Sequence, residues 1–512
     1  MPDLYCELKR LCESELYPFH MPGHKRNCES TPLKGAFNID ITEIDEFDNL
    51  HDEKGIILEA EERANRLYGA DKTFFLVNGS TCGVLSAVSA AVPEGGRILA
   101  GRGSHKSFYN AAYLRRLDIS YLPVKMIDKY GIYDGYTGDD VKEALDKSES
   151  LPSAVFITSP TYEGKCSDIS KIADLCHEKK IPLIVDAAHG AHFGFGEGIP
   201  ESAIKAGADL VIHSVHKTLP SMTQTALLHV QGSLIDKKKL KRFLTIYQSS
   251  SPSYVLMASI ELCMKEMEER GGEFVSKLLK YRKTLEEETK ELGNIRVAGL
   301  SELQDPAKAL IYLPSEAMTG QQLYDILREE YKLQLEMAGE KYALAIISGW
   351  DTEEGIRRLI DAIRHIDEDL SVHTEITKKK TAANPNSTDR EDTPHNTVIN
   401  VADSSTGVSK ESKYRVTLPA CKAKICDAWD EEKMIVPLKN ANGQISAEFI
   451  GLYPPGIPLI VPGEVFDERI VSKMIQYLDE GMNLQGIVCV GNDENKGIID
   501  TDRRGVICVK QR

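Results

Sequence analysis

The sequence predicts an α/β protein whose largest domain is a mainly parallel sheet with helices on both faces. Short apolar runs, such as residues 183–185 and 210–212, have the uncharged, β-branched character of strands buried on both sides. A helix-like stretch at 169–180 separates the first of these from an earlier run at 154–158, and this alternation is typical of a doubly wound arrangement. The runs end abruptly in polar residues. Because parallel strands bring their carboxyl ends to one edge of a sheet, we expect a functional site along that edge.

The most informative run ends in Ser214, His216 and Lys217. The amine of a lysine at the end of a buried strand can form a Schiff base with an aldehyde. His216 and Ser214 beside it suit the binding of an anion or the transfer of a proton. A Ser-x-His-Lys run in a loop is also common as ordinary polar surface, so its interpretation depends on partners elsewhere in the chain.

A second strand-like run, residues 181–185, closes on Asp186. The segment between Asp186 and Lys217 is long enough for one crossover connection, so both residues can lie at the same edge of one sheet. A carboxylate there can keep the ring nitrogen of pyridoxal 5'-phosphate protonated, and the ring then withdraws electrons from the α-carbon of an amino acid. A simpler explanation for Asp186 alone is a cap on the following helix.

The third observation is a strand at residues 73–77 that passes through Gly79 into a helix of small residues. Gly79 permits a tight turn, Ser80 and Thr81 supply hydroxyl groups, and the free amides of a helix start favour a phosphate. Taken alone, such turns are ordinary helix caps. Found together and in this order, the turn, the aspartate and the lysine predict a pyridoxal 5'-phosphate site in an aspartate aminotransferase-like fold, known as fold type I.

The chain divides into five predicted parts. They are an N-terminal segment with one short amphipathic helix (1–55), a large cofactor-binding domain (56–261), a smaller α+β domain (262–370), a polar flexible linker (371–412) and a C-terminal α+β domain (413–512). Further helices are expected at 56–68, with Gly69 as C-cap, and at 83–92, 254–269, 321–331, 353–366 and 468–480. Further strands are expected at 97–100, 223–230, 294–297, 309–313 and 342–348.

Composition excludes several classes of function. The chain of 512 residues has 62 basic and 78 acidic residues, and a net charge of −16 argues against a protein that binds nucleic acid or an anionic membrane. Eleven cysteines form no CxxC pair and no metal-binding set, and their odd number argues against a complete disulfide framework. We therefore expect no metal and a reducing, cytoplasmic location. The first residues lack the apolar core of a signal peptide, and no apolar run is long enough to span a bilayer.

Several motifs resemble the Orn/Lys/Arg decarboxylase family, specifically its shorter bacterial members. They are FHMPGHK at 19–25, DITEIDEFDNL at 40–50, GSHKS at 103–107 and SSSPSY at 249–254, with a weaker echo, YPPGIPLIVPGE, at 453–464. The Pro-Gly-His-Lys and Ser-x-His-Lys pair is the most specific part, and the resemblance covers most of residues 15–370.

This resemblance assigns roles to further residues. His105 would stack on the cofactor ring opposite Ala188, and Ser80, Thr81, Ser214 and His216 would anchor the phosphate. Ser250 would help to hold the phosphate from the neighbouring subunit, which makes the active unit at least a homodimer with shared sites. His189 either meets the substrate carboxylate or merely packs beside the ring. The carboxylates between Asp40 and Asp48 either bind a distal cation or form a solvated face.

The resemblance also implies the reaction. The expected function is decarboxylation of a basic amino acid, arginine or lysine before ornithine, to its amine and CO2, feeding polyamine metabolism. Lys217, His216 and Asp186 would be the catalytic residues, with Lys217 or His216 returning a proton to the α-carbon. The site residues alone also allow an aminotransferase or a cysteine-desulfurase-like enzyme, and a non-catalytic regulatory relative is the remaining alternative.

Overall fold

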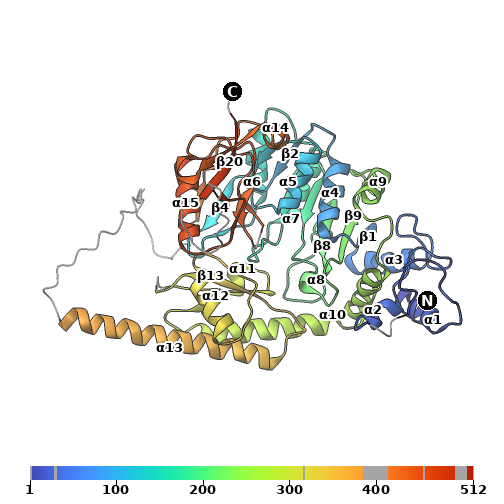
Figure 1. The fold of residues 1–512 in the computed structure, drawn as a ribbon, viewed down its shortest axis with the longest axis horizontal. Coiled ribbons are helices and arrows are strands. Elements are labelled where there is room, and N and C mark those ends of the chain that lie inside the picture. The colour runs from blue at the N-terminus through green and yellow to red at the C-terminus, as the bar shows by residue number, and fades with distance from the viewer. Residues whose placement is uncertain are drawn as a thin grey trace.

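A computed structural model describes residues 3–27, 31–314, 317–383, 413–453, 456–489 and 504–510. The chain begins with α1 (Leu4–Glu13) and α2 (Lys34–Asn38), which lie at one end of the molecule (Figure 1). The buried Leu4, Leu8 and Leu11 of α1 belong to the main core, so the N-terminal segment packs on the large domain rather than folding alone. None of the helices in the described ranges is long and apolar enough to cross a membrane.

A seven-stranded sheet forms the centre of the large domain, in the order β1-β9-β8-β7-β6-β2-β3. Its strands are β1 (Lys72–Leu76), β2 (Arg97–Ala100), β3 (Asp118–Tyr121), β6 (Ala154–Thr158), β7 (Leu183–Asp186), β8 (Leu210–Ser214) and β9 (Ala226–Val230). Neighbours from β8 to β3 are parallel, and only β9 runs against its two neighbours. The predicted mainly parallel sheet is therefore confirmed.

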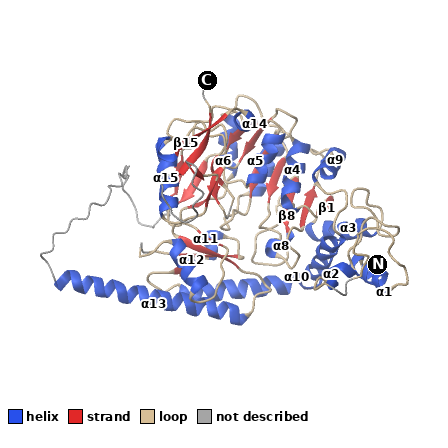
Figure 2. Cartoon of the chain, viewed as in Figure 1, coloured by secondary structure: helices blue, strands red, loops and turns tan. Residues whose placement is uncertain are grey.

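Helices cover both faces of this sheet (Figure 2). They are α3 (Ile56–Tyr68), α4 (Gly79–Ala91), α5 (Lys106–Leu114), α6 (Gly138–Asp146), α7 (Ile169–Glu178), α8 (Val215–Thr218), α9 (Lys237–Tyr247) and α10 (Tyr254–Thr289). Alternation within β8 explains the two layers: Leu210 and Ile212 pack with α4, α5 and α9, whereas Val211 packs in the core with α3, α7 and α10. The prediction of a sheet with helices on both faces is therefore confirmed.

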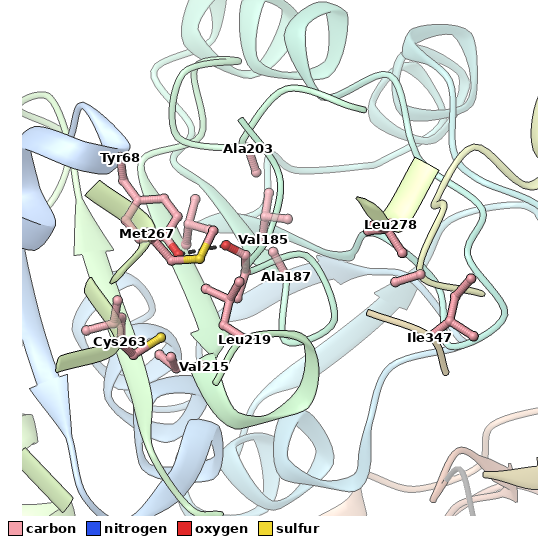
Figure 3. Packing of buried hydrophobic residues seen from close by; sticks show 14 of the residues in the cluster. Tyr68, Val185, Ala187, Ala203, Val215, Leu219, Cys263, Met267, Leu278 and Ile347 are labelled. Atoms are coloured by element: carbon pink, nitrogen blue, oxygen red, sulfur yellow. Dashed lines mark hydrogen bonds between the residues drawn. The ribbon is translucent and has the colours of Figure 1, made fainter. Parts of the chain in front are cut away.

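The core on the α10 face reaches the strand ends. Figure 3 shows Cys263 and Met267 of α10 near Val215, the first residue of α8, and Leu219, the residue that follows this short helix. All four side chains are buried in the same cluster as Val185 of β7. Burial of the first residue of α8 and of the residue after its last turn therefore fixes the segment that carries Lys217.

A second sheet belongs to the smaller α+β part. Its strands are β10 (Arg296–Val297), β11 (Lys308–Tyr312), β12 (Met337–Ala338) and β13 (Tyr342–Ile346), all antiparallel to their neighbours in the order β10-β11-β13-β12. Its helices are α11 (Leu300–Leu303), α12 (Gly320–Glu329) and α13 (Glu353–Ala383). This part lies below the large sheet in Figure 1, with α10 and α13 along its lower side.

The C-terminal part has a small core of its own around Phe466, Met474 and Val506. Its elements are α14 (Ile425–Asp430), β15 (Lys433–Pro437), the 3-10 helix η1 (Leu438–Asn440), β16 (Ile450–Leu452), β17 (Pro458–Ile460), α15 (Glu468–Asp479), β18 (Leu484–Gln485), β19 (Val488–Cys489) and β20 (Arg504–Val509). A preceding strand, β14 (Lys413–Val416), pairs with β4 (Val124–Ile127), which pairs with β5 (Ile132–Tyr133). The C-terminal part is thus tied to the large domain.

Three predicted helices are longer than expected, and the strand expected at 223–230 begins only at Ala226. The helix expected at 83–92 begins at Gly79, and the helix expected at 254–269 continues to Thr289, across the Gly271–Gly272 pair. Gly271 is tolerated because it packs against Phe195, where a Cβ would lie only 3.1 Å from the ring. The helix expected at 353–366 continues to Ala383, so the first residues of the predicted linker are helical. The remainder of that linker, 384–412, lies outside the described residues.

Candidate active site

The carboxyl ends of the large-sheet strands open into a cavity of about 430 Å³. Every predicted site residue except Ser250 lines it: Ser80, Thr81, His105, Asp186, Ala188, His189, Ser214, His216 and Lys217. They come from four places, namely the start of α4, the loop after β2, the end of β7 and the turn from β8 into α8. The sheet therefore brings together residues that are far apart in the sequence.

Lys217 lies in the cavity beside two other basic groups. Its Nζ is 3.0 Å from Nε2 of His189, and Nδ1 of His189 is 2.6 Å from Nζ of Lys308. Burial lowers the pKa of Lys217 from its ordinary value. Burial and the two neighbouring lysines hold the pKa of His189 well below its usual range. The imidazole is therefore neutral, and the lysine amine is easier to deprotonate than an exposed one.

Asp186 is a buried carboxylate that needs a cation. One of its oxygens, Oδ1, accepts a hydrogen bond from the backbone amide of Ala188 at 3.1 Å. Burial raises the pKa of Asp186, against the opposing effect of Lys217. No ion pair with a basic side chain of the described residues forms here at up to 4.0 Å. A protonated ring nitrogen placed against this carboxylate would supply the missing cation.

His105 and Ala188 also line this cavity. The first has a flat side chain and the second a small one. Nδ1 of His105 accepts a hydrogen bond from the backbone amide of Ser107 at 3.2 Å, which orients the ring at the start of α5. Burial lowers the pKa of His105 to about 4, so the imidazole is uncharged at neutral pH. A neutral planar ring suits stacking against an electron-poor aromatic group.

The cavity also offers hydrogen-bond donors, from the start of α4 and from Ser214. The cap residue of α4, Asn78, makes no side-chain hydrogen bond to the first turn, and the hydroxyl of Ser214 is buried without a partner among the described residues. Gly79 has a φ of +73°, which glycine adopts without strain. Nδ1 of His216 donates to the carbonyl of Thr225 at 2.8 Å, so its Nε2 needs a second proton before it can donate to an anion.

These residues fit pyridoxal 5'-phosphate. The unpartnered Ser214 hydroxyl and the uncapped start of α4 suit its phosphate, the buried Asp186 suits its ring nitrogen, and Lys217 suits its aldehyde. With the doubly wound sheet, this arrangement defines a pyridoxal-phosphate-dependent enzyme of fold type I.

The chain belongs to the Orn/Lys/Arg decarboxylase family. The family model described as "Orn/Lys/Arg decarboxylase, major domain" matches residues 2–330, and the model of the family's C-terminal domain matches residues 410–486. The protein is thus a pyridoxal-phosphate-dependent amino acid decarboxylase by family, as the sequence motifs predict.

Individual relatives agree with this assignment. Arginine decarboxylase of Bacillus subtilis is 29% identical over 496 residues, covering 94% of this chain and 95% of the relative. Arginine decarboxylase of Bacillus anthracis is 30% identical over 481 residues, covering 91% of each. Lysine decarboxylase LdcA of Pseudomonas aeruginosa is 23% identical over 574 residues, covering 94% of this chain and 76% of the relative. The solved structure of the Francisella novicida lysine decarboxylase LdcF has the same fold, with a TM-score of 0.79, 18% identity and coverage of 100% and 81%.

Ser250 lies outside the cavity of its own chain. Its neighbour Ser249 is exposed and donates its backbone amide to Oδ1 of Asn78 at 3.2 Å. The acidic segment at 40–48 also does not line the cavity. Instead, Asp48 accepts hydrogen bonds from the backbone amides of Lys54 and Gly55, which is a structural role.

Sequence reasoning missed several residues at the site. Glu336, Tyr162, Tyr453 and Ile457 line the cavity, and Lys308 lies directly behind His189. Glu336 immediately precedes the short strand β12, and Tyr453 and Ile457 belong to the C-terminal part. Glu336, Tyr453 and Ile457 follow no apolar run of the large sheet, which was the signal that identified the other residues. Tyr162 does follow such a run, β6, but was not singled out.

Proposed function

We propose that this protein decarboxylates arginine, with lysine as the second candidate substrate and ornithine as a weaker one. The arginine decarboxylases of Bacillus subtilis and Bacillus anthracis are 29% and 30% identical to this chain, against 23% for the lysine decarboxylase LdcA. The product would be agmatine, or cadaverine from lysine, which places the reaction in polyamine metabolism.

The observation that carries this proposal is a cavity with two separate carboxylates. Asp186 serves the cofactor ring, which leaves Glu336 for the distal cation of the substrate. The hydroxyl of Tyr162 donates to the Glu336 carboxylate and fixes its orientation. A carboxylate accepts a guanidinium through two parallel hydrogen bonds, whereas an ammonium meets it as a point charge.

The residues of the site divide the work of the reaction. Pyridoxal 5'-phosphate, when bound, accepts the electron pair that CO2 leaves on the substrate α-carbon. Asp186 keeps the ring nitrogen protonated, while His105 and Ala188 hold the ring between them. Ser80, Thr81 and Ser214 hold the phosphate. His216 joins them when the phosphate charge favours its protonated form over the effect of burial, which lowers the pKa of His216. Lys217, with His189 3.0 Å from its Nζ, delivers the proton that replaces the carboxylate, and His216 is the alternative donor.

His189 also keeps its proposed contact with the substrate carboxylate. Its Nε2 faces the cavity and is shared with Lys217. Once Lys217 is engaged elsewhere, Nε2 becomes available as a donor. Nε2 of His189 can therefore donate first to Lys217 and later to the carboxylate of the substrate.

The proposed active unit is at least a homodimer with shared sites. Ser250 is exposed and does not line its own cavity, so it is free to serve a neighbouring one. Large apolar side chains near the N-terminus are also exposed, among them Phe19 at 88%, Tyr17 at 69% and Met21 at 64%. A second copy of the chain would cover such a surface.

Mixing two inactive variants tests the sharing of sites. If Ser250 acts across the interface, Lys217→Ala and Ser250→Trp each lack activity alone, but their hybrid contains one intact site. Random mixing should then restore about a quarter of the wild-type activity, because half of the dimers are hybrids with one good site. No recovery on mixing, with hybrids verified by mass spectrometry, would place Ser250 in its own subunit.

The function itself is tested by product analysis with arginine, lysine and ornithine supplied separately. We expect CO2 and the matching amine, fastest from arginine, and loss of both the cofactor absorbance and the activity in Lys217→Ala. Keto-acid formation in place of CO2 would indicate an aminotransferase. Bound cofactor without turnover of any substrate would support the non-catalytic alternative.

A further inference from the structure

Lys308 is a fully buried lysine next to the active site. It opens β11 of the smaller sheet, and its side chain reaches His189 from behind the cavity. The backbone makes room for it: Gly164 has a φ of +104°, and a Cβ there would lie only 2.7 Å from Cγ of Lys308. A buried lysine costs stability unless its charge is paired or hydrogen-bonded.

Lys308, His189 and Lys217 are joined by two hydrogen bonds, and both run in the same direction, from Lys308 through His189 to Lys217. Among the described residues, His189 is the hydrogen-bond partner of the Lys308 amine, at 2.6 Å, and an ammonium can only donate. Nδ1 of His189 must then accept, so the single proton of the neutral imidazole is on Nε2. Nε2 donates to Lys217 at 3.0 Å, and Lys217 can accept only as an uncharged amine.

The surroundings support this arrangement of protons. Burial lowers the pKa of Lys308 to about 8, which leaves it mainly charged at neutral pH. Lys308 and His189 are surrounded by further titratable groups, namely Glu163, Asp305, Glu336, Lys217, His105 and His192. The centre of the Tyr162 ring also lies 5.5 Å from the Lys308 amine. Glu163 accepts a hydrogen bond from the hydroxyl of Tyr342, and Asp305 pairs with His192. Among the described residues, neither carboxylate forms an ion pair with Lys308 within 4.0 Å.

We propose that Lys308 is a positioning residue that fixes the tautomer of His189 and thereby keeps the amine of Lys217 uncharged in the cofactor-free protein. An uncharged amine has the lone pair that attacks the aldehyde of pyridoxal 5'-phosphate, a condensation that releases one water molecule. The inference rests on the proposed cofactor site. It adds a role for a residue of the smaller sheet that touches neither cofactor nor substrate.

The test measures covalent attachment of pyridoxal 5'-phosphate to the cofactor-free protein, followed by absorbance between pH 6 and pH 10. In Lys308→Met, His189 can turn its unprotonated nitrogen to Lys217, which favours the ammonium form of Lys217. The midpoint of attachment should therefore move to higher pH by about one unit, with a normal rate above the new midpoint. Lys308→Arg keeps a cationic donor and should keep the wild-type midpoint.

Control variants separate positioning from simple structural support. Lys239→Met removes a partly buried lysine whose amine donates to the carbonyl of Ala90, and should leave the midpoint unchanged. In a His189→Gln background, Lys308→Met should cause no further shift, because the tautomer no longer exists. If Lys308→Met alone does not fold, nitrogen NMR of His189 in the wild-type, cofactor-free protein reads the tautomer directly. The proton should be on Nε2, and a proton on Nδ1 would overturn the inference.

Three other results would also overturn the inference. They are an equal fall in rate at every pH in Lys308→Met, an unchanged midpoint, and a wild-type protein that does not attach the cofactor. Because no substrate is present, a wild-type protein that attaches the cofactor but releases no CO2 would refute the proposed reaction and leave the role of Lys308 intact.

Discussion

At the scale of single residues, Glu336 is the group on which substrate choice depends. It lines the cavity and is oriented by the hydroxyl of Tyr162. Glu336→Gln should raise KM for arginine about 10- to 100-fold, because a hydrogen bond between charged groups contributes about 1.5–3 kcal/mol. The turnover number should change less, since the distal cation is far from the reacting bond. Steady-state kinetics with CO2 detection measures both.

A matched carboxylate outside the cavity provides the control. Glu340 lies in the same part of the chain and pairs with Lys473 of α15. Glu340→Gln should leave KM for arginine at the wild-type value. If Glu336→Gln lowers the turnover number but not KM, Glu336 does not bind the distal cation.

Site residues could be predicted from the sequence where they stand at the end of an apolar, strand-like run. Asp186 and Lys217 each close an apolar run, and the ends of β6, β7 and β8 line the cavity. Lys308 gave no such signal, because lysine is normally an exposed residue and its burial depends on His189 and Gly164 from other segments. Glu336 could not be predicted either, because its position in the cavity depends on tertiary packing and not on a local sequence pattern.

At the scale of elements, α4 couples the stability of the sheet to cofactor binding. Gly83 allows this helix to lie directly on the strands: a Cβ at this position would be 2.7 Å from Cδ1 of Leu76 and 3.1 Å from Cγ2 of Ile212. Both neighbours are fully buried and cannot move aside freely. Gly83→Ala should therefore destabilise the fold by about 1–3 kcal/mol through overpacking, and weaken cofactor binding by displacing Ser80 and Thr81.

Urea unfolding and titration with pyridoxal 5'-phosphate measure these two effects. Gly272→Ala in α10 is the matched control, because a Cβ there meets nothing within 4 Å. It should stabilise the protein by about 0.5–1 kcal/mol, the ordinary gain from replacing glycine within a helix. Destabilisation of similar size in both variants would argue against a special contact at Gly83.

The same scale shows why elements were predicted unevenly. The strands β2 and β6 and the helix α3 have the predicted bounds, because their apolar pattern begins and ends sharply. The short strands β4 and β5 were missed. β4 lies between β5 and β14, and β14 comes almost three hundred residues later in the chain. Pairing partners that are remote in sequence leave little local signal.

At the scale of the whole molecule, the C-terminal part completes the active site. Tyr453 and Ile457 line the cavity, and the carbonyl of Gly456 accepts a hydrogen bond from the backbone amide of Lys106, next to His105. Arg102 secures this contact. Its guanidinium is 2% exposed and donates to Glu464 at 3.0 Å and to the carbonyls of Pro458 and Leu459. The buried Arg102 therefore holds residues 458–464 of the C-terminal part close to the segment that carries His105.

Arg102→Met should therefore loosen the C-terminal part and impair the cavity together. It leaves Glu464 buried without its cation, which costs about 3–5 kcal/mol. Hydrogen exchange of residues 456–464 should rise, and KM for substrate should rise with it, because the loop that lines the cavity is no longer held. Adding Glu464→Gln removes the unpaired charge and should recover part of the lost stability.

The surface pair between Arg116 and Asp427 joins the same two parts of the chain and provides a strict comparison. Both side chains are about half exposed, at 51% each, and their N–O distance is 2.9 Å. Arg116→Met should cost less than about 1 kcal/mol, because water and salt screen an exposed ion pair. It should leave exchange at 456–464 and KM unchanged. If both variants behave alike, the parts are held by their general packing, and the buried pair has no special role in closing the active site.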